Sequence, residues 1–230
     1  MFSPVDDLAS LSGDRELEGH FLSRWMAVAF VDSLPTPEAR RVFAVGSRSF
    51  VVARDRGGAL HVFVNACTHR GTRLCRGAGR GRMRCPYHGW VFGCDGRLLG
   101  ATRRSGLPPF DDAQMSLRRL AVRCVGPVVF AHRDPAAALD LDPELRAEVE
   151  RLGGTPARRW RRVRVSWRRL LRGQGSGSTH RVLGANLILE RFASGVRLRL
   201  VAPRARGGSV VEERAYGLGL FARARFLLGR

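Results

Sequence analysis

The amino-acid sequence predicts a mainly β protein: an antiparallel barrel or sandwich with a functional tip, followed by a partial α+β region. Three observations support this fold class. Short Val- and Phe-rich runs alternate with turn residues up to about residue 132; two segments bearing Cys and His interrupt those runs; a capped helix and further strands follow. The 230 residues, 44% of them hydrophobic, can form one large or two small domains.

The first half of the chain is expected to begin with a helix and to continue as strands. Leu17, Phe21 and Trp25 recur at helical spacing, which predicts an amphipathic helix over 15–25 with His20 packed beside it. The expected strands of this half cover 26–31, 41–45, 50–54, 60–65, 82–84, 120–124 and 127–132. They form a scaffold whose loops can carry function at one end.

A hairpin is expected over residues 90–99. Asp95-Gly96 separates the two short apolar runs of this segment and predicts a type I′ turn. His61 and His132 fall within expected strands, match no ligand spacing and are interpreted as half-buried structural residues.

The second half begins with a helix that has a clear start signal. Asp142 is an expected N-cap, Pro143 occupies the first helical position, and Gly153-Gly154 ends the helix. Residues 173–179 are Gly- and Ser-rich and typical of a linker, without the pattern of a phosphate-binding loop. Three strands of a meander are expected over 187–192, 196–201 and 209–216.

Two short segments carry the chemistry: Cys67-Thr68-His69 and Cys85-Pro86-Tyr87-His88. Each supplies one thiolate and one imidazole, and two Cys with two His is the ligand set of a Rieske [2Fe–2S] centre. In such a centre both thiolates bind one iron and both imidazoles bind the other, which leaves a less negative cluster that is easier to reduce. The sequence therefore predicts that Cys67, His69, Cys85 and His88 are the metal ligands.

A structural zinc site is the alternative for the same four residues. Zinc sites usually pair Cys with Cys and His with His at short spacing, whereas here each pair is mixed. The flanks also favour the cluster, because Gly71 and Gly89 let the backbone approach the sulfurs and donate N–H groups. Pro86 would stiffen the second loop, and Trp90 would shield the cluster from water.

The two segments with their flanks, 67–71 and 85–90, resemble the cluster signature of the large (alpha) subunit of Rieske non-haem iron aromatic ring-hydroxylating oxygenases. The resemblance is strong from about Leu17 to Pro135. It implies an oxidoreductase with one [2Fe–2S] cluster, a ferredoxin or reductase as electron donor, O₂-dependent hydroxylation, and assembly into homo-oligomers or with a partner oxygenase subunit. Respiratory Rieske proteins carry a further disulfide, whose cysteines would fall at Thr72 and Tyr87 here.

The second half departs from the family pattern. The family holds a mononuclear Fe(II) by two His and one carboxylate, on a helix after an Asn-Trp-Lys-like segment that Ser166-Trp167-Arg168 resembles. Here the Gly/Ser stretch replaces that helix, and His180 is the only His after His132. The chain therefore resembles an alpha subunit truncated in its catalytic domain, with no catalytic residue assigned. The alternative is an electron-transfer protein without hydroxylase activity.

These readings divide the chain into a helical arm (1–22), a Rieske [2Fe–2S] domain (23–135) and a remnant of a catalytic-type domain with a helix-grip-like sheet (136–230). The acidic N-terminus Met1–Asp7 resembles no signal peptide, and the run 221–228 is too short and too basic to span a membrane. A cytoplasmic location is therefore expected.

The net charge of +20 comes from arginine alone, since the chain has no lysine. This composition is typical of a GC-rich genome, and it weakens an inference from charge to nucleic-acid binding. The basic runs 158–162 and 167–169 are more typical of a solvated face or of a dock for an acidic protein. Cys75, Cys94 and Cys124 remain, and Cys75 is interpreted as a small buried hydrophobe.

Overall fold

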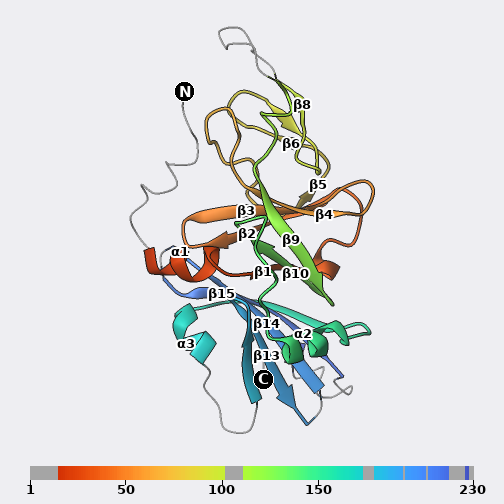
Figure 1. Ribbon diagram of the computed structural model, residues 1–230, viewed down its shortest axis with the longest axis vertical. Coiled ribbons are helices and arrows are strands. Elements are labelled where there is room, and N and C mark those ends of the chain that lie inside the picture. Colours follow the sequence, from red (N-terminus) through yellow and green to blue (C-terminus); the bar gives the residue numbers. More distant parts are fainter. Residues whose placement is uncertain are drawn as a thin grey trace.

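The computed structural model describes residues 15–101, 111–172, 179–193, 195–205, 207–217 and 226–227, and it is mainly β (Figure 1). The helices are α1 (Arg15–Leu22), α2 (Pro143–Glu150) and α3 (Trp167–Arg172), with a 3₁₀ turn at Val31–Ser33. The segments 1–7, 173–178 and 221–225, to which the sequence interpretation refers, lie outside the described residues.

The strands of the first half are β1 (Met26–Phe30), β2 (Ala39–Val45), β3 (Arg48–Arg54), β4 (Leu60–Val64), β5 (Gly79–Arg80), β6 (Met83–Arg84), β7 (Val91–Phe92), β8 (Leu98–Gly100), β9 (Arg119–Val125) and β10 (Val128–His132). Those of the second half are β11 (Ala157–Val163), β12 (Thr179–Leu183), β13 (Leu187–Phe192), β14 (Gly195–Pro203) and β15 (Ser209–Tyr216). All expected strands are present, with ends shifted by a few residues.

A curled antiparallel sheet of seven strands forms the scaffold, in the order β1-β10-β9-β4-β3-β2-β5. Its inner strand β3 buries Val51, Val52 and Ala53 in succession, because both faces of the sheet are covered there. Strand β5 was not predicted, since two residues carry no periodic pattern. Helix α1 ends at Leu22, three residues before the expected end, and Trp25 is buried at the entry to β1.

A small sheet of β6, β7 and β8 forms the tip of the molecule (Figure 1). The prediction of a type I′ turn at Asp95-Gly96 is wrong. Gly96 donates to the Gly93 carbonyl (3.0 Å), Gly93 donates to the Arg97 carbonyl (2.9 Å), and Gly96 has a φ of 82° whereas Asp95 has no positive φ. The loop therefore has three residues, and only its glycine adopts the left-handed conformation, which spares the aspartate that strain.

A second antiparallel sheet, in the order β11-β15-β14-β13-β12, follows the first. Strands β11 and β12 were not predicted. The basic run 158–162 lies in β11, where Arg159 and Arg161 both contact the buried carboxylate of Glu213 (2.8 and 3.3 Å). Part of that run is therefore neutralised within the sheet, rather than forming a free basic patch.

The helices of the second half lie beside this sheet (Figure 1). The predicted N-cap is confirmed, because the Asp142 carboxylate accepts a hydrogen bond from Leu145 N–H at 3.0 Å. Helix α2 ends at Glu150, before Gly153-Gly154, and α3 forms where no helix was predicted. No helix of the described segments has the length and apolarity needed to cross a bilayer.

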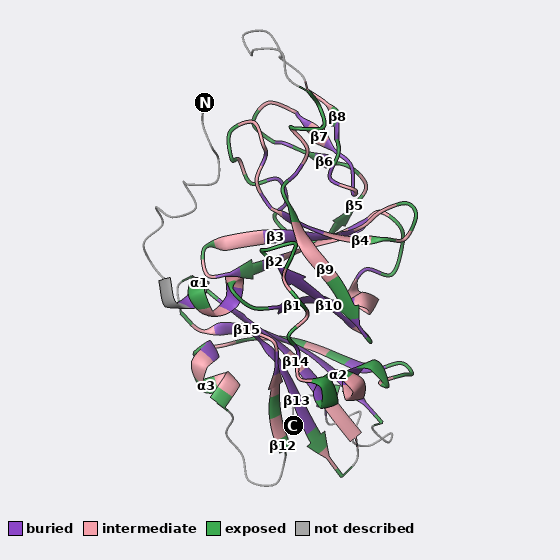
Figure 2. Cartoon of the chain, in the orientation of Figure 1, coloured by how far each residue is buried: buried purple, intermediate pink, exposed green. Residues whose placement is uncertain are grey.

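The two large sheets share one hydrophobic core. All five residues of β1 are buried, and they pack in the same apolar cluster as Leu187, Leu189 and Leu198 of the second sheet. Figure 2 shows buried strands of both sheets facing one another. Asn186 joins the two sheets, because its side chain accepts from Ala27 N–H (2.7 Å) and donates to the Ala27 carbonyl (2.8 Å).

Candidate metal centre

The first ligand loop follows β4 and is closed by its own backbone. The Cys67 N–H donates to the Thr72 carbonyl, and the Cys67 carbonyl accepts from Gly71 N–H, both at 2.8 Å. Asn65 holds the far side of this loop: its side chain donates to the Cys75 carbonyl (2.7 Å) and accepts from Cys75 N–H (2.9 Å). The loop is thus shaped by contacts that do not involve the predicted ligand atoms.

The second ligand loop, between β6 and β7, repeats the same backbone pattern. The Cys85 N–H donates to the Trp90 carbonyl (2.7 Å), and the Cys85 carbonyl accepts from Gly89 N–H (3.0 Å). Gly71 and Gly89 have positive φ values of 68° and 71°, a conformation that costs other residues energy. Two loops of one design therefore face each other, with the histidine two residues after the cysteine in one and three residues after it in the other.

The structure brings the four predicted ligands together as two pairs. The Cys67 thiol has the Cys85 thiol as a hydrogen-bonding neighbour, and both residues are buried. The Nδ1 atoms of His69 and His88 lie 3.0 Å apart, and both rings are half-buried. The sulfur pair is thus deeper in the protein, and the imidazole pair is nearer its surface.

Aromatic rings hold the two imidazoles in place. The Trp90 indole, fully buried, stacks on His69 with ring centres 4.8 Å apart and planes 6° apart. Tyr87 stacks on His88 with ring centres 3.8 Å apart, and its side chain is 56% exposed. Trp90 therefore packs against the ring of the predicted ligand His69; that it shields a cluster from water stays a prediction.

The protonation of these residues suits a positively charged metal group. Burial, together with the neighbouring Cys85, raises the pKa of Cys67 to about 11. An empty site therefore keeps that thiol protonated, and metal binding supplies the positive charge that makes the thiolate favourable. Burial and His88 lower the pKa of His69, so its imidazole is neutral and able to bind metal at neutral pH.

The residues fit a two-iron cluster better than a single zinc ion. Within the described ranges, no three or more His, Cys, Asp or Glu side chains converge as ligands of one metal ion. A tetrahedral zinc site needs four ligands around one ion, whereas each iron of a Rieske centre takes only two protein ligands. The observed thiol pair and imidazole pair match the second arrangement.

An apolar layer surrounds the thiol pair. Both thiols belong to a buried cluster that also contains Phe63, Met83 and Phe92. The hydroxyl of Thr68 donates to the Met115 carbonyl at 2.6 Å and ties the first loop to the segment before β9. Such a layer limits water near a metal group and helps to set its potential.

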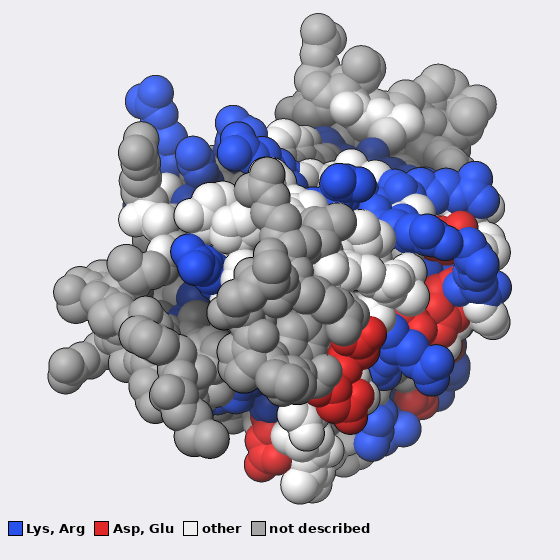
Figure 3. All heavy atoms as spheres, turned by 90° about the horizontal axis from the view of Figure 1, so that it is seen from above, with Lys and Arg blue, Asp and Glu red and all other residues white. Residues whose placement is uncertain are grey.

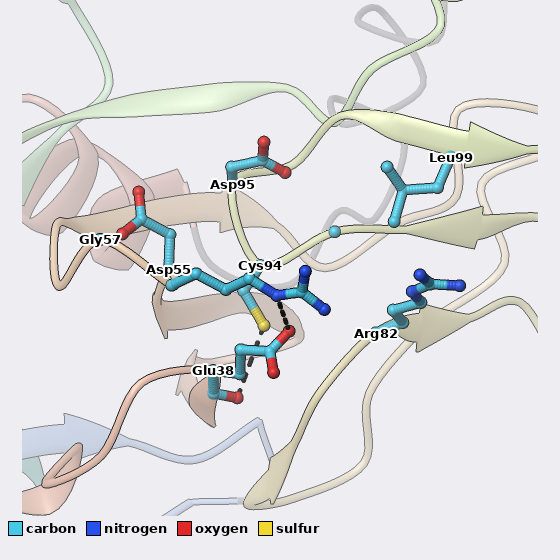
Figure 4. Close-up of a pocket in the computed structure, with 9 residues that line it drawn as sticks. Glu38, Asp55, Gly57, Arg82, Cys94, Asp95 and Leu99 are labelled. Atoms are coloured by element: carbon cyan, nitrogen blue, oxygen red, sulfur yellow. Dashed lines mark hydrogen bonds and ion pairs between the residues drawn. The ribbon is translucent and has the colours of Figure 1, made fainter.

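The other cysteines take no part in this arrangement. Cys75 is buried in the same apolar cluster, as predicted. Cys94 lies at a pocket of about 290 Å³ on another side of the tip, where its thiol contacts the carbonyls of Glu38 (3.5 Å) and Gly81 (3.2 Å) (Figure 4). None of the four predicted ligands lines this pocket. Cys124 is exposed on β9.

The remaining histidines lie apart and have structural contacts. His61 is ion-paired to Asp55 (2.7 Å), and His132 is bonded to the backbone of Asp134 (3.0 Å). The contacts of His20 and His180 are with the Ala185 and Leu171 carbonyls, each at 2.8 Å.

Sequence reasoning did not identify Asn65 and Thr68 as residues that shape the site. Their role depends on contacts with Cys75 and Met115, which are distant along the chain. Only the position of Asn65 directly before the first ligand loop could have indicated it.

Comparisons with known proteins agree with this geometry. The sequence model described as the Rieske [2Fe–2S] domain matches residues 24–111. The chain carries a Rieske [2Fe–2S] domain. It is 37% identical over 120 residues to the chloroplastic choline monooxygenase of Amaranthus tricolor, and 36% identical over 157 residues to the anthranilate 1,2-dioxygenase large subunit of Burkholderia cepacia. Over these aligned segments the chain is similar to subunits of Rieske oxygenases.

These alignments are partial. They cover 52% of this chain and 27% of the choline monooxygenase, and 62% of this chain and 37% of the anthranilate dioxygenase subunit. The chain therefore matches only 27% to 37% of the length of these relatives.

Solved structures extend the likeness of fold to the second sheet. The apo form of the quaternary ammonium Rieske monooxygenase CntA superposes with a TM-score of 0.68 at 21% identity, covering 91% of this chain and 73% of that one. The naphthalene 1,2-dioxygenase of Rhodococcus superposes with a TM-score of 0.66 at 18% identity, covering 87% and 70%. The mainly β fold, with an α+β region after the Rieske fold, is therefore confirmed.

Proposed function

We propose that Cys67, His69, Cys85 and His88 bind one Rieske [2Fe–2S] cluster that accepts and passes on single electrons. The observation that carries this proposal is the arrangement of the ligands as a buried thiol pair and a half-buried imidazole pair with Nδ1 atoms 3.0 Å apart. When bound, the cluster supplies one-electron redox chemistry at a higher potential than an all-thiolate cluster.

The protein's own groups would set the conditions for that chemistry. The apolar residues around the thiol pair exclude water, and the stacked ring of Trp90 holds His69 in one orientation. The half-exposed imidazoles would provide the path by which electrons enter or leave, because they lie nearer the surface than the thiols. The described residues are thus organised for electron transfer at the tip.

Two readings of the whole chain follow. In the first, the chain is an oxygenase-type oxidoreductase that takes electrons from a ferredoxin or reductase and works as an oligomer or with a partner oxygenase subunit. In the second, it only transfers electrons. The second has one specific argument: a mononuclear Fe(II) site needs two His, and His180 is the only one after the Rieske domain.

We also propose the unit boundaries 1–22, 23–135 and 136–230, and a cytoplasmic location. The boundary near 135 is supported by β10, the last strand of the seven-stranded sheet, which ends at His132, and by α2, which begins at Pro143. The location is supported by cysteines kept reduced for a cluster.

Anaerobic reconstitution with iron and sulfide tests the proposal. About two irons per chain, with the spectrum of a Rieske centre, are expected. Stoichiometric zinc, with no Rieske spectrum after reconstitution, would contradict it. About three irons per chain would favour the oxygenase reading over electron transfer alone.

A further inference from the structure

The tip that carries the candidate metal centre is strongly basic. Residues 66–101 contain seven arginines, at positions 70, 73, 76, 80, 82, 84 and 97, and a single acidic residue, Asp95. All seven arginines are exposed. Figure 3 looks down on this end of the molecule and shows arginine side chains spread across it, with the acidic atoms gathered along one side.

Most of these arginines have no acidic partner. Arg97 is ion-paired to Asp95 (3.5 Å), and Arg80 donates to the Pro37 carbonyl (3.1 Å). The other five form no ion pair with any residue that the structure describes, and we call them the arginine tip: Arg70, Arg73, Arg76, Arg82 and Arg84. Their charge is therefore available to a partner, unlike that of Arg159 and Arg161 in β11.

The metal centre does not need this charge. A Rieske cluster with two thiolates and two neutral imidazoles is uncharged in its oxidised form and gains one negative charge on reduction. Five guanidinium groups exceed that charge several-fold. A surface with charge of one sign speeds the association of an oppositely charged protein and disfavours the binding of proteins with like charge.

The segment that carries the arginine tip also carries an exposed aromatic ring. Tyr87 is 56% exposed and stacks on the predicted ligand His88 at 3.8 Å. Arg70 directly follows His69 in the sequence and is exposed, so positive charge lies close to the imidazole pair. An aromatic centre with a charged rim is the usual composition of a protein–protein interface.

We propose that the arginine tip docks an acidic redox protein over Tyr87, so that electrons enter through the imidazole pair. This inference rests on the proposed function, because it assigns a partner surface to the same site. It places docking on the Rieske tip rather than on the basic strand β11, where Glu213 holds Arg159 and Arg161 and Asp32 holds Arg158.

The experiment uses the reconstituted full chain and an acidic plant-type [2Fe–2S] ferredoxin as the reduced electron donor. Stopped-flow measurements give the second-order rate of electron transfer at several ionic strengths. We expect the rate to fall steeply with salt and the triple variant R70Q/R73Q/R84Q to lower it about tenfold or more at low salt. The triple variant R123Q/R151Q/R164Q removes the same charge from exposed arginines elsewhere and should leave the rate within about twofold.

The outcomes separate this inference from the proposed function. Absence of a Rieske spectrum before any donor is added would overturn the proposed function itself. A normal spectrum and potential in all variants, with equal rates and equal salt dependence for the two triple variants, would overturn the docking surface alone. Salt-sensitive binding of duplex DNA that depends on the arginine tip, without an effect on electron transfer, would also overturn it by showing a nucleic-acid partner.

Discussion

At the scale of single residues, the candidate metal centre depends on how the four predicted ligands are paired: the two thiols would share one iron and the two imidazoles the other. The four predicted ligands lie in two loops of the same backbone design, and each loop delivers one sulfur and one imidazole. Because the thiols meet on the buried side and the imidazoles on the outer side, the two irons would have different electronic surroundings. Replacing one predicted ligand residue by another residue type can test this difference between the two irons.

Replacing His69 or His88 by cysteine should turn the mixed ligand set toward an all-thiolate one. Each replacement adds a negative thiolate and disfavours reduction, so the potential should move toward the about −400 mV of plant-type ferredoxins. Electron paramagnetic resonance and redox titration measure the change. Unchanged spectra in both variants would show that these histidines are not ligands.

The sequence predicts four candidate ligands, because a mixed Cys/His spacing with glycine flanks matches few other sites, and that assignment stays a prediction. Their arrangement could not be predicted. That the imidazoles meet through Nδ1, and that Trp90 stacks on His69, depends on side-chain orientations across two loops. The supporting role of Asn65 likewise depends on a partner ten residues away.

At the scale of elements, period-2 patterns predicted strands well where apolar residues alternate or run together, as in β3 and β13. The pattern failed in β11, because the segment 158–162 has arginines on both faces of the strand. On the less exposed face, Arg159 and Arg161 pair with the Glu213 carboxylate instead of apolar side chains. The turn at Asp95-Gly96 failed for a different reason, since a dipeptide does not reveal that Cys94 belongs to the loop.

The loops near the tip offer a matched pair of glycine variants, Gly96 between β7 and β8 and Gly81 between β5 and β6. Gly96 and Gly81 have similar positive φ values, 82° and 80°, but an added Cβ at Gly96 would meet the Phe63 ring at 2.3 Å and at Gly81 would meet nothing within 4 Å. G81A should cost about 1 kcal/mol of unfolding free energy from backbone strain alone, and G96A about 2–4 kcal/mol. Denaturant unfolding measures both; equal losses would contradict the contact with Phe63.

The start of α2 predicts a pH-dependent contribution to stability. Leu145 N–H and Arg181 lower the pKa of the Asp142 carboxyl below its ordinary value of 3.8. A carboxyl with a lowered folded pKa stabilises the fold above its unfolded pKa, and that stabilisation is lost as pH falls through the folded pKa. D142A should therefore melt below the parent protein at pH 7, and the difference should shrink in acid.

The variant D142N is the control for that measurement, because asparagine caps helices well without a charge. The melting temperature of D142N should lie closer to that of the parent protein than the D142A value does at pH 7, and the D142N difference should change little with pH. If the melting temperature of D142A stayed below that of the parent protein by the same amount down to pH 2, the charge of Asp142 would not contribute to stability.

At the scale of the whole molecule, one buried arginine connects the two large sheets. Arg214 of β15 is 4% exposed, contacts Asp32 and Glu212 at 2.8 and 2.9 Å, and lies over the Phe30 ring at 4.4 Å. Such long-range pairing is invisible in the sequence, where Asp32 and Arg214 are 182 residues apart.

Removing this arginine should destabilise both sheets together. R214A removes the buried arginine that Asp32 and Glu212 share and leaves each carboxylate with one other arginine, Arg158 and Arg41 respectively. The loss should cost about 2–3 kcal/mol. Circular dichroism and the visible spectrum of the reconstituted cluster should then lose signal in one transition shifted to lower denaturant. Separate transitions for the two signals would show that the sheets unfold independently.

The chain alone is expected not to hydroxylate a substrate with O₂. The Nδ1 of His180 lies 3.8 Å from the Glu190 carboxylate of β13, and its Nε2 contacts the Leu171 carbonyl of α3, so its ring is already held between the helix and the second sheet. The test is a single turnover, in which the reduced protein meets O₂ and a panel of aromatic substrates. Stoichiometric hydroxylated product that disappears in H180A would show an iron site in the second region.

The shared core has a consequence for how this chain can change in evolution. The strand β1 has its five residues covered in a core that includes Leu187, Leu189 and Leu198. A variant that lost the second sheet would expose this apolar surface, and the remaining redox domain would aggregate. Selection would therefore remove such a variant even if the smaller domain could still carry electrons. Natural selection can therefore preserve residues 157–216 as a cover for the redox domain, even where their own chemistry is dispensable.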